Sequence, residues 1–321
     1  MVWDITATDH KFPLKSAFRI ARGAKTHAHS IIANVTDPAT GYSGYGEATP
    51  YARYGENVAS VLNAINNGAP LLTGAAANAV DCAKWDLQAK LNNKPVWQQL
   101  NLPEPTPVQT AVTLSLAAPT EMAVEAKRLA KFPLLKLKLA GDGMDGDRLK
   151  AVRDQAPAPQ LILDGNEGFT ISSLEKLLPD LVQANIALVE QPLPAGKDDT
   201  LASLRGTIPF CADESVHTVD DLPRLKPLYD AVNIKLDKAG GLSPALSLAK
   251  AAKADGFSIM IGCMVASSRA MAPALLLASF ADFVDLDGPL FLVEDCPHGL
   301  TYNGAMIPPA SPNLWGFPCP N

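Results

Sequence analysis

The sequence has few cysteines, and nothing in their spacing pairs them. Its five cysteines stand far apart along 321 residues, and no two of them form a Cys-x-x-Cys motif. This distribution argues against a disulfide framework or a zinc site and is typical of a reduced compartment. The first ten residues also lack the charged lead, apolar core and small-residue cleavage site of a secretion signal. We therefore expect a cytoplasmic protein.

Two classes of partner are argued against by what is missing. No apolar run reaches the roughly 18 residues of a membrane-spanning helix, so we expect no membrane partner. Lysine and arginine number 27 against 33 aspartates and glutamates, and no basic patch is interleaved with aromatic residues, which argues against nucleic acid. No Walker-type loop, dinucleotide-binding glycine turn or Ser/His/Asp set is present. The sequence leaves the oligomeric state open, a homo-oligomer included.

The apolar content and the alternation of elements indicate the fold class. Apolar residues make up 47% of the chain, which supports one large α/β barrel or two ordinary domains. β-rich runs and two helical patterns come first, and the proline-rich segment 102–107 predicts a stiff linker. Beyond it, short strands alternate with helices until eight strands have passed. Repeated βα units predict an α/β fold with a closed parallel barrel and helices outside.

Some of these expectations concern boundaries. The first barrel strand is predicted at 109–114 and the eighth at 283–287. Before the linker, two glycine-containing segments, 19–26 and 41–51, are rich in turn-forming residues. They are either ordinary hairpin connections or parts of a lid, and composition does not decide between the two.

The predicted strand 134–139 is apolar except for two lysines. Because side chains alternate along a strand, Lys136 and Lys138 share one face. Lysine is rarely buried without a partner, so this is either an edge strand with one wet face or a barrel strand that delivers two cations to an active site. Lys235 interrupts the sixth predicted strand, 231–236, in the same way. The second and sixth strands of an eight-stranded barrel lie opposite each other, so Lys138 and Lys235 should face each other.

Three predicted strands in succession end in a carboxylate. Asp164 ends the third, Glu190 the fourth and Asp213 the fifth, where barrel active sites are built. A single acid after a strand is usually a helix N-cap, but three at one level repel each other unless a cation neutralises them. Oxygen ligands with open positions suit Mg²⁺.

Two lysines that face each other across a metal ion suggest a reaction. One amine can remove a proton from one face of a carbon atom, and the other can deliver a proton to the opposite face. The carbanion between them is an enolate, which Mg²⁺ stabilises as a Lewis acid. Because a lysine base must be neutral near pH 7, we expect Mg²⁺ and the Lys136 ammonium to lower its pKa.

Together these residues resemble the enolase superfamily, muconate-lactonising-enzyme subgroup, whose members use a lysine or histidine base with Mg²⁺. The motifs that carry the resemblance are Lys136-x-Lys138, Asp164, Glu190, Asp213-Glu-Ser and Asn233-x-Lys235-x-x-Lys238-x-Gly-Gly. The resemblance implies a (β/α)7β TIM-like barrel over 108–297 and an α+β capping domain over 1–107, completed by the tail 298–321. It also makes the two early glycine-containing segments capping loops. The seventh strand ends at 260–264 without histidine, unlike the mandelate-racemase subgroup.

Within the subgroup, three stretches are similar to L-Ala-D/L-Glu epimerases, namely 19–23, 46–56 and 285–289. Asp285 and Asp287 lie two apart at the end of the eighth predicted strand, so both should face inward. Two further carboxylates beside a metal are costly unless they meet a cation, and the free ammonium of a dipeptide is one. Alternatively, one aspartate pairs with a lysine and the other caps a helix.

The same resemblance implies two further substrate contacts. Arg22, on the first capping loop, would meet the acidic side chain of the substrate, or else it is a solvated loop arginine. Thr113, near the end of the first barrel strand, would be a second contact.

The sequence thus predicts a Mg²⁺-dependent isomerase, a dipeptide epimerase. Lys138 and Lys235 would exchange the α-proton of the C-terminal residue, with Lys136 assisting, and the resemblance implies a role in peptidoglycan recycling. An N-acylamino acid racemase or o-succinylbenzoate synthase is the alternative with a substrate that lacks a free ammonium. A non-catalytic binding scaffold is the alternative from another class.

Overall fold

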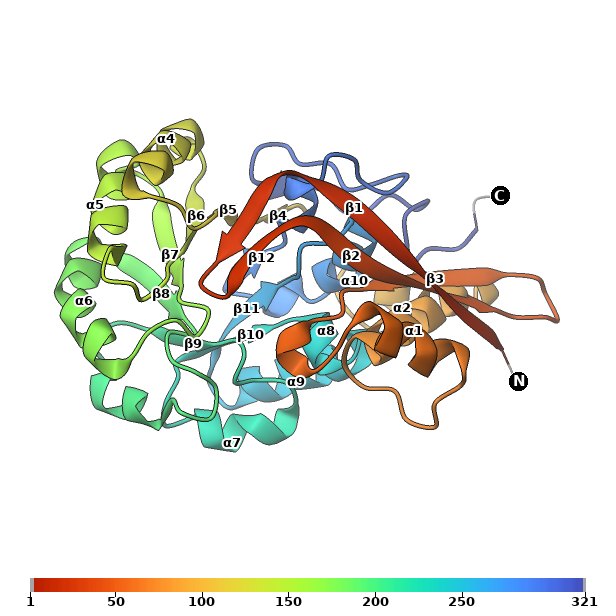
Figure 1. Ribbon diagram of the computed structural model, residues 1–321. Helices are drawn as coiled ribbons and strands as arrows, with labels where there is room; N and C mark the ends of the chain where they lie inside the picture. Colours follow the sequence, from red (N-terminus) through yellow and green to blue (C-terminus); the bar gives the residue numbers. More distant parts are fainter. Residues whose placement is uncertain (1–2, 320–321) are drawn as a thin grey trace.

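Eight parallel strands form one sheet in the computed structural model, which describes residues 3–319 (Figure 1). Their order in the sheet follows the chain: β5 (Val112–Leu114), β6 (Leu134–Lys138), β7 (Gln160–Asp164), β8 (Ile186–Glu190), β9 (Phe210–Ala212), β10 (Ala231–Ile234), β11 (Ser258–Gly262) and β12 (Phe283–Asp285). The first and last strands are also neighbours, because the Ala111 N–H donates to the Val284 carbonyl at 2.7 Å. The sheet therefore curves into the predicted TIM-like barrel.

Helices cover the outside of this sheet. They are α4 (Pro119–Leu129), α5 (Asp145–Gln155), α6 (Ile171–Gln183), α7 (Leu222–Leu225), α9 (Leu242–Ala254) and α10 (Ser268–Leu275), with the one-turn α8 (Leu236–Ala239) directly after β10. In α6, Thr170 and Ser173 form a capping box, and the buried Leu174, Leu177 and Leu181 recur at helical spacing towards the strands. Between β8 and β9 a short 3-10 helix, η2 (Asp199–Leu204), replaces the α-helix. No helix within residues 3–319 is long and apolar enough to cross a bilayer.

The inner face of the barrel changes from apolar to charged along the strands. At the amino ends, a separate cluster of small and medium side chains fills the interior; it includes Leu134, Ile162, Leu188 and Met260. Two residues further along β6, and on the same face, lies Lys136, which is 1% exposed. The apolar layer thus closes one end of the barrel and leaves the charged layer at the other. The edge-strand interpretation of 134–139 is wrong.

A second layer lies over the charged end of the barrel. It consists of the antiparallel sheet β1 (Asp4–Ile20), β2 (Gly23–Thr36) and β3 (Ser43–Ala48), packed on α1 (Val58–Asn66) and α2 (Gly74–Leu91). The β1–β2 hairpin, red and orange in Figure 1, arches from this sheet towards the barrel strands. The short 3-10 helix η1 (Ala52–Tyr54) follows β3. These elements supply the two loops that approach the barrel mouth.

The glycines of β3 serve close packing and not a turn. The sequence indicated turns across 41–51, yet residues 43–48 are a strand paired with β2. A Cβ on Gly44 would lie 2.2 Å from the Ala83 carbonyl oxygen, and one on Gly46 would lie 2.1 Å from that of Ala79. Both carbonyls belong to α2, so only glycine lets the strand approach the helix backbone.

Two predicted barrel strands are shorter than expected. Residues 109–114 divide into β4 (Val108–Gln109) and β5, because β4 pairs with β13 (Met306–Ile307) of the C-terminal segment. The eighth strand ends at Asp285 and not at 287, since the Asp287 backbone turns into the 3-10 helix η5 (Gly288–Phe291).

The C-terminal segment packs against helix α2 in the N-terminal part of the chain. The Trp315 indole donates to the Cys82 carbonyl at 3.0 Å, and the Gly316 N–H donates to Asp86 Oδ1 at 2.8 Å, both on α2. The short helix α3 (Val96–Gln99) also contacts this segment through the Val96 N–H and the Gly316 carbonyl. The exact domain boundary at residue 107 stays a prediction.

Gly46→Ala should destabilise the protein by about 3 kcal/mol, because the new methyl group meets the backbone of α2. Gly41→Ala is the matched control: it has open space but a left-handed backbone (φ 75°), and should cost about 1 kcal/mol. Urea unfolding of both variants measures the difference. Equal losses for the two would contradict the close-packing explanation.

Candidate active site

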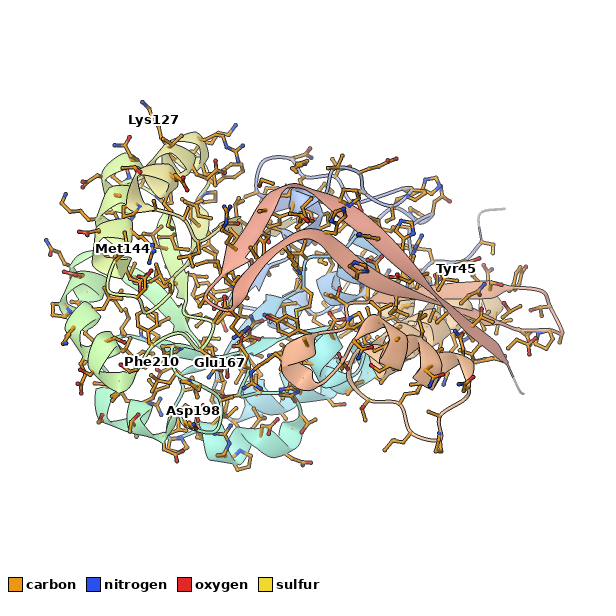
Figure 2. The ribbon with its side chains drawn as sticks, viewed as in Figure 1. Tyr45, Lys127, Met144, Glu167, Asp198 and Phe210 are labelled. Carbon is orange, nitrogen blue, oxygen red and sulfur yellow. The ribbon has the colours of Figure 1, made fainter. Side chains whose placement is uncertain are left out.

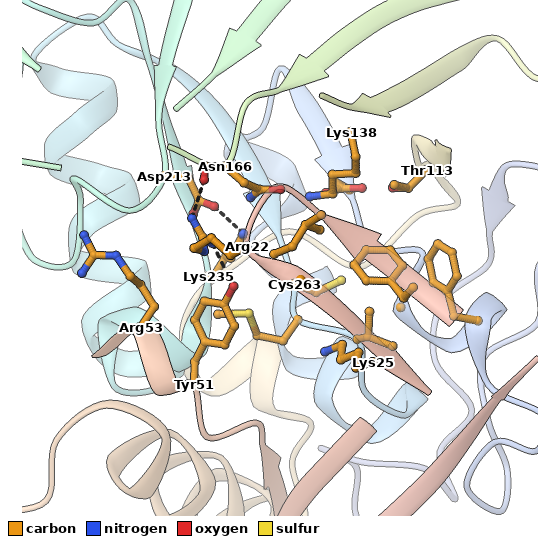
Figure 3. Close-up of a pocket in the computed structure, with 18 of the residues that line it drawn as sticks. Arg22, Lys25, Tyr51, Arg53, Thr113, Lys138, Asn166, Asp213, Lys235 and Cys263 are labelled. Carbon is orange, nitrogen blue, oxygen red and sulfur yellow. Dashed lines mark hydrogen bonds and ion pairs between the residues drawn. The ribbon is translucent and has the colours of Figure 1, made fainter. Parts of the chain in front are cut away.

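A cavity of about 400 Å³ lies between the carboxyl ends of the barrel strands and the two capping loops (Figure 3). Eight of the residues predicted for the site line it: Arg22, Thr113, Lys136, Lys138, Asp213, Lys235, Asp285 and Asp287. The other two, Asp164 and Glu190, are fully buried against the lysines. The structure therefore brings all ten together at one end of the barrel.

Lys136 connects three carboxylates. Its Nζ lies 2.6 Å from Glu190 Oε2, 2.8 Å from Asp285 Oδ2 and 3.2 Å from Asp164 Oδ2. Lys138 lies two residues further along β6, and its Nζ is 2.5 Å from the same Asp164 oxygen. Desolvation alone would make these charges very costly, and the pairing offsets it.

Lys235 approaches from the opposite side of the barrel. It directly follows β10, and its Nζ lies 2.6 Å from Asp213 Oδ2. Lys238 Nζ lies 2.6 Å from Asp213 Oδ1. Three strands lie between β6 and β10 in either direction around the barrel, so Lys138 and Lys235 face one cavity from opposite walls.

The carboxylate partners of Lys235 determine the direction of its pKa shift. Burial lowers the pKa of Lys235 and Lys136 lowers it further, but attraction to Asp213 and Glu190 is stronger, and the pKa lies well above its ordinary value. The carboxylate partners therefore outweigh burial and repulsion when no cation is bound. The lowered pKa was expected with Mg²⁺ beside the lysine and stays a prediction.

The acid cluster suits an oxygen-seeking cation in its chemistry. As the side chains stand, no three His, Cys, Asp or Glu residues within 3–319 form a ready metal site, since lysines occupy the positions between the acids. The carboxylates nonetheless come from three adjacent strand ends, and the buried Asn233 Oδ1 beside Glu190 has no hydrogen-bond partner. Burial and the charge of Asp164 raise the pKa of Glu190 to about 7. A hard cation would relieve this repulsion.

Asp285 and Asp287 both line the cavity, but Asp285 belongs to strand β12 and Asp287 lies in the segment after it. Asp285 pairs with Lys136, as the alternative interpretation expected for one aspartate. Asp287 lies beyond the strand and accepts a hydrogen bond from the Thr113 N–H at 2.7 Å. Asp285 Oδ1 is buried with no hydrogen-bond partner, and burial together with the charge of Asp285 raises the pKa of Asp287 to about 7. This corner of the cavity is therefore short of positive charge.

Arg22 is partly exposed on the capping loop, but its guanidinium is bound by other residues of the protein. Its Nη2 donates to Glu214 Oε1 at 2.6 Å and to the Tyr51 hydroxyl at 2.8 Å, and its Nη1 donates to the Asn166 carbonyl at 2.7 Å. Glu167 also accepts from Arg22; it lies between barrel and capping layer in Figure 2. These bonds tie the first capping loop to the barrel mouth. A contact of Arg22 with substrate stays a prediction.

Several residues of the site were not predicted from the sequence. Lys238 and Asn233 belong to the motif around Lys235, and that membership was the available signal. Glu214 follows Asp213 just beyond β9 and lines the same cavity, but its partner Arg22 is remote in the sequence, so nothing indicated that contact. Lys25 lines the cavity from β2 and carried no signal beyond lying in a basic loop.

Asp287→Asn should stabilise the metal-free protein by about 4 kcal/mol at pH 8 and by about 1–2 kcal/mol at pH 5. The carboxyl titrates near 3.9 in an unfolded chain and at about 7 in the fold. The charged form therefore costs stability that is absent below about pH 4 and complete above about pH 7. Thermal unfolding at both pH values, with the exposed Asp220→Asn as control, measures this. A gain that is equal at both pH values would contradict it.

Comparison with known proteins identifies the family. Residues 99–300 match the family described as Enolase C-terminal domain-like, and residues 56–100 match the Mandelate racemase / muconate lactonizing enzyme, N-terminal domain. Among curated proteins, an N-acetyl-D-glutamate racemase from Pseudoalteromonas is 43% identical over 86% of this chain and 92% of its own length. The L-Ala-D/L-Glu epimerase of Escherichia coli is 40% identical over 92% of this chain and 96% of its own.

Solved structures agree with these relatives. An enolase family member from Agrobacterium tumefaciens with homology to dipeptide epimerases, solved with sodium and L-Ala-L-Glu, has a TM-score of 0.92 and 43% identity, covering 98% of this chain and 99% of that one. The dipeptide epimerase of Enterococcus faecalis, solved with Mg and L-Leu-L-Tyr, has a TM-score of 0.89 and 27% identity, with coverage of 98% and 99%. These relatives and structures confirm the prediction of an isomerase and argue against the alternative of a non-catalytic binding scaffold. The chain belongs to the enolase superfamily, within the mandelate racemase/muconate lactonizing enzyme family.

Proposed function

We propose that the protein is a Mg²⁺-dependent epimerase of dipeptides of the L-Ala-D/L-Glu type, acting at the α-carbon of the C-terminal residue. The observation that carries the proposal is the pair Lys138 and Lys235, which reach one cavity from opposite walls of the barrel. Inversion at carbon needs a proton acceptor on one face and a proton donor on the other, and this pair meets that need.

Each turnover would move one proton off the α-carbon and another onto it. A neutral amine at Lys138 or Lys235 takes the α-proton, and the electron pair of the C–H bond passes towards the adjoining carboxylate. The ammonium opposite then donates a proton to the other face of the carbon. The two lysines end with exchanged protonation states, so the reaction runs in both directions. Lys136 stays charged between its carboxylates and adds positive potential beside the substrate carboxylate.

Asp164, Glu190 and Asp213 would hold the Mg²⁺. When bound, the ion neutralises these acids and stabilises negative charge on the substrate carboxylate. Asp164 and Asp213 are also the partners of Lys138 and Lys235. With those carboxylates engaged as ligands, the two lysines would lose their close anionic partners, and one of them would be available as a base.

Asp285 and Asp287 favour a substrate with a free ammonium. The unpartnered Asp285 oxygen and the raised pKa of Asp287 describe a corner that a cation would stabilise. The N-terminal ammonium of a dipeptide supplies that charge. An N-acylamino acid racemase is the second candidate, because the Pseudoalteromonas relative is named for N-acetyl-D-glutamate, which has no such ammonium.

Incubation of the protein with L-Ala-L-Glu and Mg²⁺ in D₂O should place deuterium at the glutamate α-carbon and form the epimer. Lys235→Met and Lys138→Met should each lose epimerisation by about a thousandfold. Each variant should still exchange the proton of one diastereomer, and the two variants should differ in which one. Mass spectrometry with chiral separation measures both outcomes.

Lys150→Met is the matched control, since that lysine is exposed on the outside of the barrel and paired with Asp154. It should behave as the unaltered protein. Absence of deuterium with the unaltered protein, or exchange of both diastereomers by either single-lysine variant, would rule out the two-lysine mechanism.

Asp287→Asn should separate the two candidate substrates. It should lower kcat/KM for L-Ala-L-Glu by about a hundredfold, because the ammonium loses a charged partner in a buried corner. It should change kcat/KM for N-acetyl-L-glutamate less than threefold. Polarimetry of both reactions gives the ratio. Unaltered dipeptide turnover in this variant would favour the N-acylamino acid racemase.

A further inference from the structure

We infer that Gln191 is a positioning residue that fixes the spacing of the three carboxylates proposed to hold Mg²⁺, without itself lining the cavity. The inference rests on the proposed function, since it takes Asp164, Glu190 and Asp213 as the ligands. It assigns a role to a residue that the sequence patterns did not connect with the site.

The Gln191 backbone joins the strand ends that carry those carboxylates. Gln191 directly follows Glu190, the last residue of β8. Its N–H donates to the Cys211 carbonyl of β9 at 2.8 Å, and its carbonyl accepts from the Glu167 N–H, in the loop after β7, at 2.8 Å. Gln191 therefore contacts the segments on both sides of its own strand.

The Gln191 side chain extends this connection beyond β9. Its Oε1 accepts from the Asp213 N–H at 2.9 Å and from the Ser215 N–H at 3.0 Å. The peptide that carries the Asp213 carboxylate is thus held from the neighbouring strand end. All three residues are buried, so loss of this acceptor would leave two N–H groups without a partner.

A buried carboxylate fixes the direction in which the Gln191 amide points. Its Nε2 donates to the Leu193 carbonyl and to the hydroxyls of Ser215 and Tyr229, each at 2.9 Å. Both hydroxyls donate in turn to Oδ2 of Asp198, which is labelled in Figure 2. Burial raises the pKa of Asp198, but the hydrogen bonds that it accepts outweigh burial and the pKa lies below its ordinary value. The hydroxyl oxygens therefore accept from Nε2, which leaves Oε1 for the two N–H groups.

The backbone conformation of Gln191 agrees with such a role. Its φ of 32° lies in the left-handed region, which residues other than glycine rarely adopt. A strained conformation of this kind persists only where the surrounding structure over-determines it, and such residues cluster at functional sites. Here the hydrogen bonds to the segments after β7, β8 and β9 supply that determination.

Mg²⁺ is sensitive to the spacing of its ligands. It demands a near-ideal octahedron of oxygen atoms, whereas Ca²⁺ accepts a larger and more flexible set. Residues that orient metal ligands from outside the coordination shell contribute about tenfold to a hundredfold to metal affinity. A relaxed segment around Asp213 should therefore weaken the binding of Mg²⁺ more than that of Ca²⁺.

Gln191→Met should weaken Mg²⁺ binding about tenfold to a hundredfold and Ca²⁺ binding much less, so that the ratio of the two affinities changes. Methionine has the length of glutamine but cannot accept from the two N–H groups. Calorimetric titration of the full-length, metal-free protein with MgCl₂ and with CaCl₂ measures both affinities. Gln191→Asn keeps the amide but is one methylene shorter; it should show the same change and serves if the methionine variant does not fold.

Tyr229→Phe is the matched control, because it removes a buried hydrogen bond from the same amide and leaves the acceptor of the Asp213 N–H in place. It should lower the temperature of thermal unfolding but keep both metal affinities within about threefold of the unaltered protein. An equal loss of Mg²⁺ affinity in Tyr229→Phe and Gln191→Met would overturn the inference, because general loosening would then explain both.

Metal binding keeps this inference separable from the proposed function, since it needs no turnover. A changed ratio of affinities in Gln191→Met supports the positioning role even if the unaltered protein places no deuterium in L-Ala-L-Glu. Unchanged affinities in Gln191→Met, or no binding of Mg²⁺ to the unaltered protein, overturn the role of Gln191. Deuterium exchange by the unaltered protein tests the proposed reaction independently.

Discussion

The compensation of buried charge at the carboxyl end of the barrel governs the rest of this structure. Asp164 and Glu190 are fully buried, and an unpaired carboxylate in such a place would ionise only at great cost. Lys136 and its neighbours supply the counter-charges at distances near 2.6 Å. The strand ends that carry these groups are held by an apolar layer beneath them, so the charges cannot relax into water. Removing one charge leaves its partner uncompensated.

One corner of the cavity has carboxylates whose negative charge is not fully compensated by the protein. Asp285 shares the Lys136 ammonium with two other carboxylates and keeps one buried oxygen without a hydrogen-bond partner, and burial beside it raises the pKa of Asp287 to about 7. A cationic group on a bound molecule would complement the charge of this corner. The protein thereby keeps destabilised groups in the free state whose relief contributes to binding, which is a common relation between stability and function.

The capping layer is positioned by carboxylates that cross between the two parts of the chain. Glu47 on β3 accepts a hydrogen bond from the Ser267 N–H at 2.9 Å, at the start of α10. Asp237 on α8 accepts from the Thr49 N–H at 2.7 Å and from Asn78 on α2 at 3.1 Å. These bonds hold the capping layer against the barrel, so its position over the mouth depends on contacts between residues far apart in the sequence.

The sequence by itself determined the barrel, the strand-end acids and the opposed lysines, because strand alternation and chain order dictate which side chains meet at the mouth. Which charged side chains pair with each other was decided only by the tertiary structure. Arg22 and Glu214 are 192 residues apart, and no local pattern joins them. The strand character of β3 likewise depends on the α2 backbone against which its glycines lie. Periodicity reports which face a side chain occupies, whereas pairing depends on distances set by the packing of elements remote in the chain.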